Sequence, residues 1–133
     1  MTPDLLFVAY SAVLTWVMLM TGSLLRSRAW RPDGLTFAFG NRHGAWEVSP
    51  LGGRAHRAAR NMLENFVLFA ALVLVAHAGE VPGERLQHGA AVFFWARVVY
   101  FGVYLAGIMY LRTAVWAVSV VGLGMILAAI MAG

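Results

Sequence analysis

The stretch LLFVAYSAVLTWVMLMTGSLL, from Leu5 to Leu25, contains no charged residue. A helix needs about 20 mostly apolar residues to cross the roughly 30 Å hydrocarbon layer of a bilayer, so this stretch is typical of a transmembrane helix. Asp4 precedes it, where a cleaved signal peptide would be basic, and we therefore expect the span to remain in the protein.

Three further mostly apolar stretches of this length follow, at about 58–78, 86–110 and 113–132. The second span contains Arg60 and Glu64, the third contains Arg97, and the fourth is uncharged. With 61% hydrophobic and only 12% charged residues, the chain has more apolar surface than a water-soluble domain of its size can bury. The sequence therefore predicts an all-α integral membrane protein, a four-transmembrane-helix bundle that forms one domain over residues 1–133 in a lipid bilayer. The absence of cysteine excludes disulfides, thiolate zinc sites and a cysteine nucleophile.

The basic residues are ten arginines, and seven of them lie between the first span and the start of the second. Arg112 lies in the third connection, whereas the second connection has only Arg85. By the positive-inside rule, the first and third connections are cytoplasmic and both termini are on the non-cytoplasmic side. We interpret the positive charge as this topology signal and expect no nucleic-acid partner.

The long first connection contains two turn signals, RPDG at Arg31–Gly34 and PLGG at Pro50–Gly53. The aromatic residues Phe37, Phe39 and Trp46 lie between them. This mixture predicts an ordered loop at the membrane interface.

Polar side chains within the spans are informative because a charge at the centre of a bilayer costs about 2.5–3.5 kcal/mol. The spacing of Arg57, Asn61 and Glu64 places them on one face of the second helix, with Arg60 beside them. On the third helix, one face has Arg97, Tyr100 and Tyr104. Guanidinium forks, a carboxylate, an amide and phenol hydroxyls together suit a small zwitterion with several carboxylates.

The same residues also have a purely structural interpretation, which their spacing leaves open. Glu64 and Arg97 would satisfy each other in an ion pair between helices, and the two tyrosines would be core or interface aromatics. The four histidines are His43, His56, His77 and His88. They lack metal-ligand spacing, so we expect no metal site.

Two segments of the chain resemble the MAPEG superfamily, the membrane-associated proteins in eicosanoid and glutathione metabolism. They are RAHRAARNMLENF at Arg54–Phe66, and FWARVVY at Phe94–Tyr100 with Tyr104 after it. The resemblance covers nearly the whole chain. The loop signature Gly40-Asn41-Arg42 and the run Leu111-Arg112-Thr113 are similar to a bacterial branch of the family.

The resemblance implies a homotrimer that holds glutathione, as co-substrate, between neighbouring subunits near the cytoplasmic face. The positions that match the family's glutathione-binding residues are Arg57, Arg60, Asn61, Glu64, Tyr100 and Tyr104. Arg112 matches the arginine that stabilises the glutathione thiolate in active relatives, which makes it the candidate catalytic residue. The bacterial branch implies a multi-pass protein of the cell inner membrane.

Two functions remain open at this point. The first is a glutathione-dependent transferase or peroxidase-like enzyme that acts on small lipophilic electrophiles by thiolate activation. The alternative is a non-catalytic protein of the same fold that serves as a structural or accessory subunit of a larger membrane complex. A transporter is less favoured, since no repeat or broken helix is evident.

Overall fold

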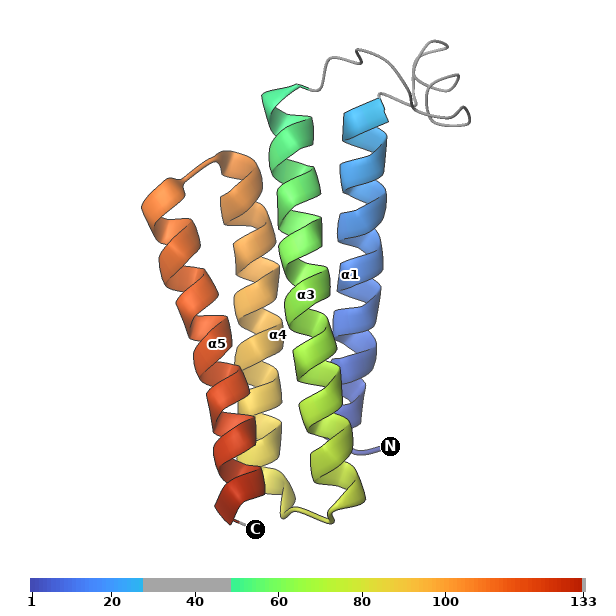
Figure 1. The fold of residues 1–133 in the computed structure, drawn as a ribbon, viewed down its shortest axis with the longest axis vertical. Coiled ribbons are helices and arrows are strands. Elements are labelled where there is room, and N and C mark those ends of the chain that lie inside the picture. Colours follow the sequence, from blue (N-terminus) through green and yellow to red (C-terminus); the bar gives the residue numbers. More distant parts are fainter. Residues whose placement is uncertain (28–48, 133) are drawn as a thin grey trace.

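The computed structural model describes residues 1–27 and 49–132, and within these ranges the chain is helical without a strand (Figure 1). The helices are α1 (Pro3–Ser27), α3 (Pro50–Ala78), α4 (Gly83–Ala106) and α5 (Met109–Ala132). All four are long and apolar enough to cross a membrane. The prediction of an all-α, four-helix membrane protein is therefore confirmed. The predicted interfacial loop, with Phe37, Phe39 and Trp46, lies outside the described residues.

The helices run up and down side by side, so that the N-terminus and the α3–α4 turn lie at one end of the bundle (Figure 1). Every helix contributes to one buried core. Phe69 of α3 stacks on Phe93 of α4 with ring centroids 4.2 Å apart, and Met18 of α1 and Ile126 of α5 are fully buried. Large apolar side chains elsewhere face outward, as expected for a protein whose solvent is lipid.

Helix α3 begins eight residues before the predicted span, at Pro50 rather than near residue 58. The PLGG segment is its first turn instead of a loop, because Pro50 occupies the first helical position, where no backbone donor is needed. The Ser49 hydroxyl caps the helix by accepting a hydrogen bond from the Gly52 amide at 3.0 Å. A Cβ atom at Gly52 would lie 2.9 Å from the Leu25 carbonyl oxygen, so glycine permits α1 to approach here.

Helix α4, which corresponds to the third predicted span, ends at Ala106, four residues before the predicted boundary of 110. Gly107 adopts φ 77°, a left-handed conformation that terminates helices, and its amide donates to the Tyr104 carbonyl at 3.0 Å. The Arg54 Nε atom also donates to the Leu105 carbonyl at 3.2 Å, which caps the end of α4 from α3. Because α5 begins at Met109, Arg112 lies in its first turn.

Candidate functional site

The largest fully buried side chain in the described structure is Arg97, on α4. Its Nη2 atom donates to the Asn61 Oδ1 atom at 2.8 Å, and its Nε atom donates to the Met62 sulfur at 3.3 Å. Among the described residues, its Nη1 atom has no hydrogen-bond partner. A buried guanidinium without a carboxylate partner is costly, so an amide on α3 and an aromatic face supply most of its stabilisation.

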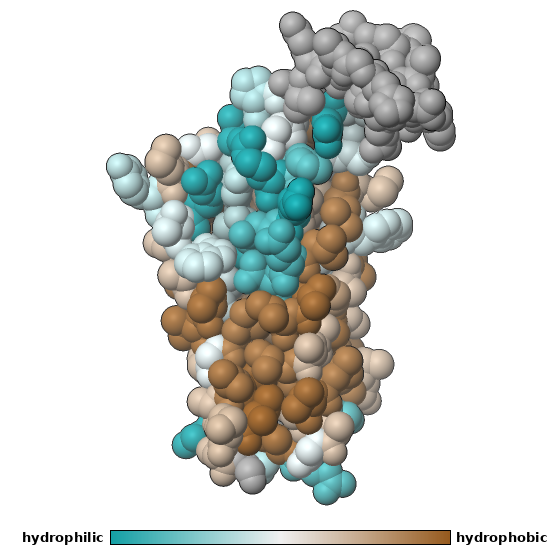
Figure 2. Space-filling view, in the orientation of Figure 1, coloured by the Kyte–Doolittle hydropathy of each residue, from teal (hydrophilic) through white to brown (hydrophobic). Residues whose placement is uncertain are grey.

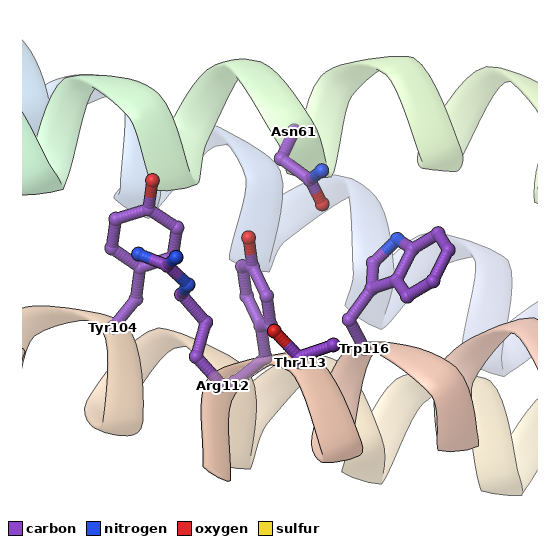
Figure 3. Close-up of a pocket in the computed structure, with 6 residues that line it drawn as sticks. Asn61, Tyr104, Arg112, Thr113 and Trp116 are labelled. Atoms are coloured by element: carbon purple, nitrogen blue, oxygen red, sulfur yellow. The ribbon is translucent and has the colours of Figure 1, made fainter. Parts of the chain in front are cut away.

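Asn61 is held in one orientation by two hydrogen bonds to its side-chain oxygen. Besides Arg97, Asn65 donates to the Asn61 Oδ1 atom at 3.3 Å and to its backbone carbonyl at 2.8 Å. Because both hydrogen bonds use the oxygen, the Asn61 amide nitrogen remains as a donor. Figure 3 shows Asn61 reaching from α3 toward Trp116 of α5.

The two tyrosines of α4 lie between two guanidinium groups. Arg97 lies over the Tyr100 ring at 4.1 Å, and Arg112 lies over the Tyr104 ring at 4.7 Å. The rings meet edge to face with centroids 5.4 Å apart. Cation–π contacts of this kind are stronger where water is excluded, and here they fix Arg112 relative to the phenols.

These side chains enclose a pocket of about 250 Å³ near the end of the bundle where α4 passes into α5. It is lined by Asn61 of α3, Tyr100 and Tyr104 of α4, and Arg112, Thr113 and Trp116 of α5 (Figure 3). The lining offers guanidinium, amide and hydroxyl donors and no carboxylate. The pocket therefore has the chemistry of an anion-binding site.

Comparison with known protein families gives one match. The profile of the MAPEG family matches residues 5–132, which is nearly the whole chain. The chain belongs to the MAPEG family. No curated protein and no solved structure matches it. The protein is therefore a multi-pass membrane member of the superfamily of eicosanoid and glutathione metabolism.

In this MAPEG protein only some of the predicted site residues line the pocket. Asn61, Tyr100, Tyr104 and Arg112 line the pocket together. Arg60 and Glu64 form an ion pair with Nε and Oε1 3.5 Å apart, but their side chains are 75% and 66% exposed. They line a second hollow of about 400 Å³ with His56, Leu19 and Leu63. Arg57 is exposed, and its guanidinium lies beside Gly53, one turn earlier.

The Glu64–Arg97 ion pair that the spacing left open does not form between these described residues. Arg97 takes Asn61 as its partner, and Glu64 takes Arg60. The buried charge of Arg97 is thus not paired with the exposed charge of Glu64, and the pocket beside Asn61 remains open.

Thr113 and Trp116 line the pocket but were not among the predicted site residues. A sequence signal exists for Trp116, because it follows Arg112 by four residues and so lies on the same face of the helix. Thr113 follows Arg112 directly, and helical spacing gives no such signal for it. The described residues contain no group of three His, Asp or Glu side chains that could hold a metal ion. His43 lies outside them.

Proposed function

We propose that this MAPEG protein is a glutathione-dependent membrane enzyme that conjugates or reduces small lipophilic electrophiles. The observation that supports this proposal is the pocket in which Arg112, Tyr104, Tyr100 and Asn61 converge. Neither Arg97 nor Arg112 forms an ion pair with a carboxylate of the described chain. Their positive charge is therefore available to an anionic guest.

Glutathione fits this donor set because it has two carboxylates, an amino group and a thiol. The guanidinium of Arg112 and the phenol hydroxyls would contact the sulfur and nearby carboxylate, and the Asn61 amide would donate to a peptide or carboxylate oxygen. Glu64, with Arg60, offers a carboxylate for the amino group on the adjacent, outward-facing surface of α3. The residues present thus fit the tripeptide.

The proposed assembly is a homotrimer with glutathione between neighbouring subunits. Figure 2 shows hydrophilic surface reaching from one end of the bundle to about its middle over α3, above a hydrophobic lower half. Exposed polar groups at membrane depth are costly in contact with lipid. A neighbouring subunit and a bound tripeptide would cover this surface. In this proposal both termini are non-cytoplasmic and the arginine-rich end faces the cytoplasm of the cell inner membrane.

The proposed reaction begins with loss of the thiol proton to water. The thiolate is stabilised by the Arg112 guanidinium and by a hydrogen bond from a tyrosine hydroxyl. With a chlorinated nitrobenzene, the sulfur forms a bond to the ring carbon, and the carbon–chlorine bond breaks to release chloride. The described chain needs to supply only binding, orientation and positive charge in these steps.

Arg112→Ala tests the catalytic assignment. We expect it to lower the rate of conjugation of a chlorinated nitrobenzene at saturating glutathione by at least about tenfold, because one pKa unit of thiolate stabilisation corresponds to 1.36 kcal/mol. Glutathione binding should weaken less, since other residues hold the tripeptide. The matched control is Arg85→Ala at the opposite end of the bundle, which should be unaffected. Equal turnover by the Arg112 variant removes this residue from the reaction.

A thermal unfolding measurement separates the enzyme from the accessory subunit. A ligand at a hundredfold excess over its dissociation constant adds about 2.7 kcal/mol to the stability of the folded state. We therefore expect glutathione to raise the unfolding temperature of the purified protein. Absence of this shift, together with stoichiometric partners in a mild-detergent purification, favours the non-catalytic alternative.

A further inference from the structure

The end of the bundle opposite the arginine-rich pocket contains a second polar hollow of about 380 Å³. It lies where α1 begins and where α3 turns into α4. Its polar lining consists of Asp4, His77, Glu80, Gln87 and Thr2. The lining contains two carboxylates and no arginine, so its charge is opposite to that of the pocket at Arg112.

Asp4 is only 3% exposed, and its Oδ2 atom has no hydrogen-bond partner among the described residues. The His77 Nδ1 atom is 3.9 Å from Oδ2, beyond hydrogen-bond distance, and the His77 side chain is half exposed. An acid in the first turn of α1 is favoured by the helix dipole, but the dipole supplies no hydrogen bond to this oxygen. The Oδ2 atom of this buried carboxylate therefore lacks a donor among the described residues, and Asp4 lines an open hollow.

Glu80 brings a second carboxylate to the same hollow. It occupies the α3–α4 turn, where its amide donates to the His77 carbonyl at 3.2 Å. Asp4 of α1 and Glu80 of the α3–α4 turn thus line one space, together with Gln87 and Thr2.

The arrangement favours an organic cation over a metal ion. The described His, Asp and Glu side chains form no group of three that could ligate a metal, and about 380 Å³ is far larger than a bare ion needs. A primary ammonium group donates three hydrogen bonds and is positively charged, which matches an unpartnered carboxylate oxygen with a second acid nearby. The hollow also lies at the end of the spans, at the depth of lipid headgroups.

We propose that this hollow binds a primary ammonium group, of an aminophospholipid headgroup or of a small free amine, through Asp4 and Glu80. The site is separate from the proposed glutathione site. It would anchor the junction of α1, α3 and α4 to its ligand, and it depends on neither Arg112 nor glutathione.

Calorimetric titration of the full-length protein in detergent tests this proposal, with three probes. They are dihexanoylphosphatidylethanolamine, dihexanoylphosphatidylcholine and ethanolamine. We expect the ethanolamine lipid to bind at least tenfold more tightly than the choline lipid, which cannot donate from its quaternary nitrogen. Asp4→Asn should weaken this binding at least tenfold, or 1.4 kcal/mol, and Glu84→Gln, an exposed charge change on the first turn of α4, should leave it unchanged.

Each result has a defined meaning. Tight binding of the lipid but not of ethanolamine supports a headgroup as the source of the ammonium, and equal binding of both supports a free amine. Equal binding of the two lipids, or an unchanged affinity in Asp4→Asn, overturns the proposal. If Asp4→Asn does not fold, Glu80→Gln at the exposed turn provides the same measurement, with at least a threefold loss expected and no loss overturning the proposal.

Discussion

Replacing Asn61 with leucine is expected to destabilise the bundle, because the buried Arg97 guanidinium would lose its hydrogen-bond acceptor. Asn61 accepts the 2.8 Å hydrogen bond from the Arg97 Nη2 atom, and Arg97 is fully buried. Nη1 already lacks a partner among the described residues. In Asn61→Leu the guanidinium would retain only the Met62 sulfur and the Tyr100 ring.

The size of the effect follows from the charge on the donor. A hydrogen bond to a charged group contributes about 1.5–3 kcal/mol, and a buried donor left without its acceptor costs at least as much. Asn65→Leu is the matched control, because it also removes hydrogen bonds to Asn61 but leaves the Arg97–Asn61 hydrogen bond in place. Each of its two neutral bonds contributes about 0.5–1.5 kcal/mol, and the bond to Oδ1 is lost in both variants, so it cancels in the comparison. We therefore expect Asn61→Leu to lose about 1–2 kcal/mol more than the control.

A second substitution separates the buried charge from packing. In Asn61→Leu with Arg97→Met, no cation remains to be desolvated, and apolar replacement of a buried charged pair is often neutral or stabilising. The free energies of unfolding are measured by dodecyl sulfate titration, with helicity followed by circular dichroism and glutathione absent. A coupling energy of about 1.5–3 kcal/mol between the two sites is expected. A coupling within about 0.5 kcal/mol of zero refutes the reasoning, because independent sites behave in that way.

Two further predictions concern the junction of α4 and α5. Arg54→Ala removes the side chain that donates to the Leu105 carbonyl and is expected to cost about 1 kcal/mol in the same titration, whereas no change contradicts a capping role. Gly107→Ala forces a side chain into φ 77° and is expected to cost about 1–2 kcal/mol. Its control is the helical Gly102→Ala, which meets no atom within 4 Å and should be neutral or stabilising by up to about 1 kcal/mol. Equal stability of the two glycine variants contradicts the left-handed requirement.

The fold was predictable because lipid imposes a simple requirement on the sequence. Long, mostly apolar runs are needed wherever a helix crosses the hydrocarbon layer, and all four were visible. The helix ends were less predictable, because they depend on single residues. Pro50 belongs to a turn or to the first position of a helix, and only the Ser49 cap decides between them. Gly107 ends α4 inside an apolar stretch, so the hydropathy of the sequence does not reveal this helix end.

Four of the seven predicted site residues line the pocket, whereas the pairing of the charged side chains was not predictable. Asn61, Tyr100, Tyr104 and Arg112 converge on one pocket, as their placement on three helices suggested. Helical spacing gave Asn61 and Glu64 nearly the same direction, since three residues along a helix differ by about 60°. Which of the two faces Arg97 depends on how α3 is rotated against α4, and a rotation of this size is set by packing rather than by spacing.

The pairing of Arg97 with Asn61 bears on function as well as on stability. If Glu64 had neutralised Arg97, the two charges would have cancelled, and the pocket beside them would have faced only the positive charge of Arg112. An amide partner orients the guanidinium without cancelling its charge. Arg97 over the Tyr100 ring and Arg112 over the Tyr104 ring therefore both keep their positive charge beside residues that line the pocket. In a medium of low dielectric constant, both charges act over several ångströms. Two guanidinium groups without a carboxylate partner among the described residues are costly at membrane depth, and in the proposed function the carboxylates of glutathione would offset that cost.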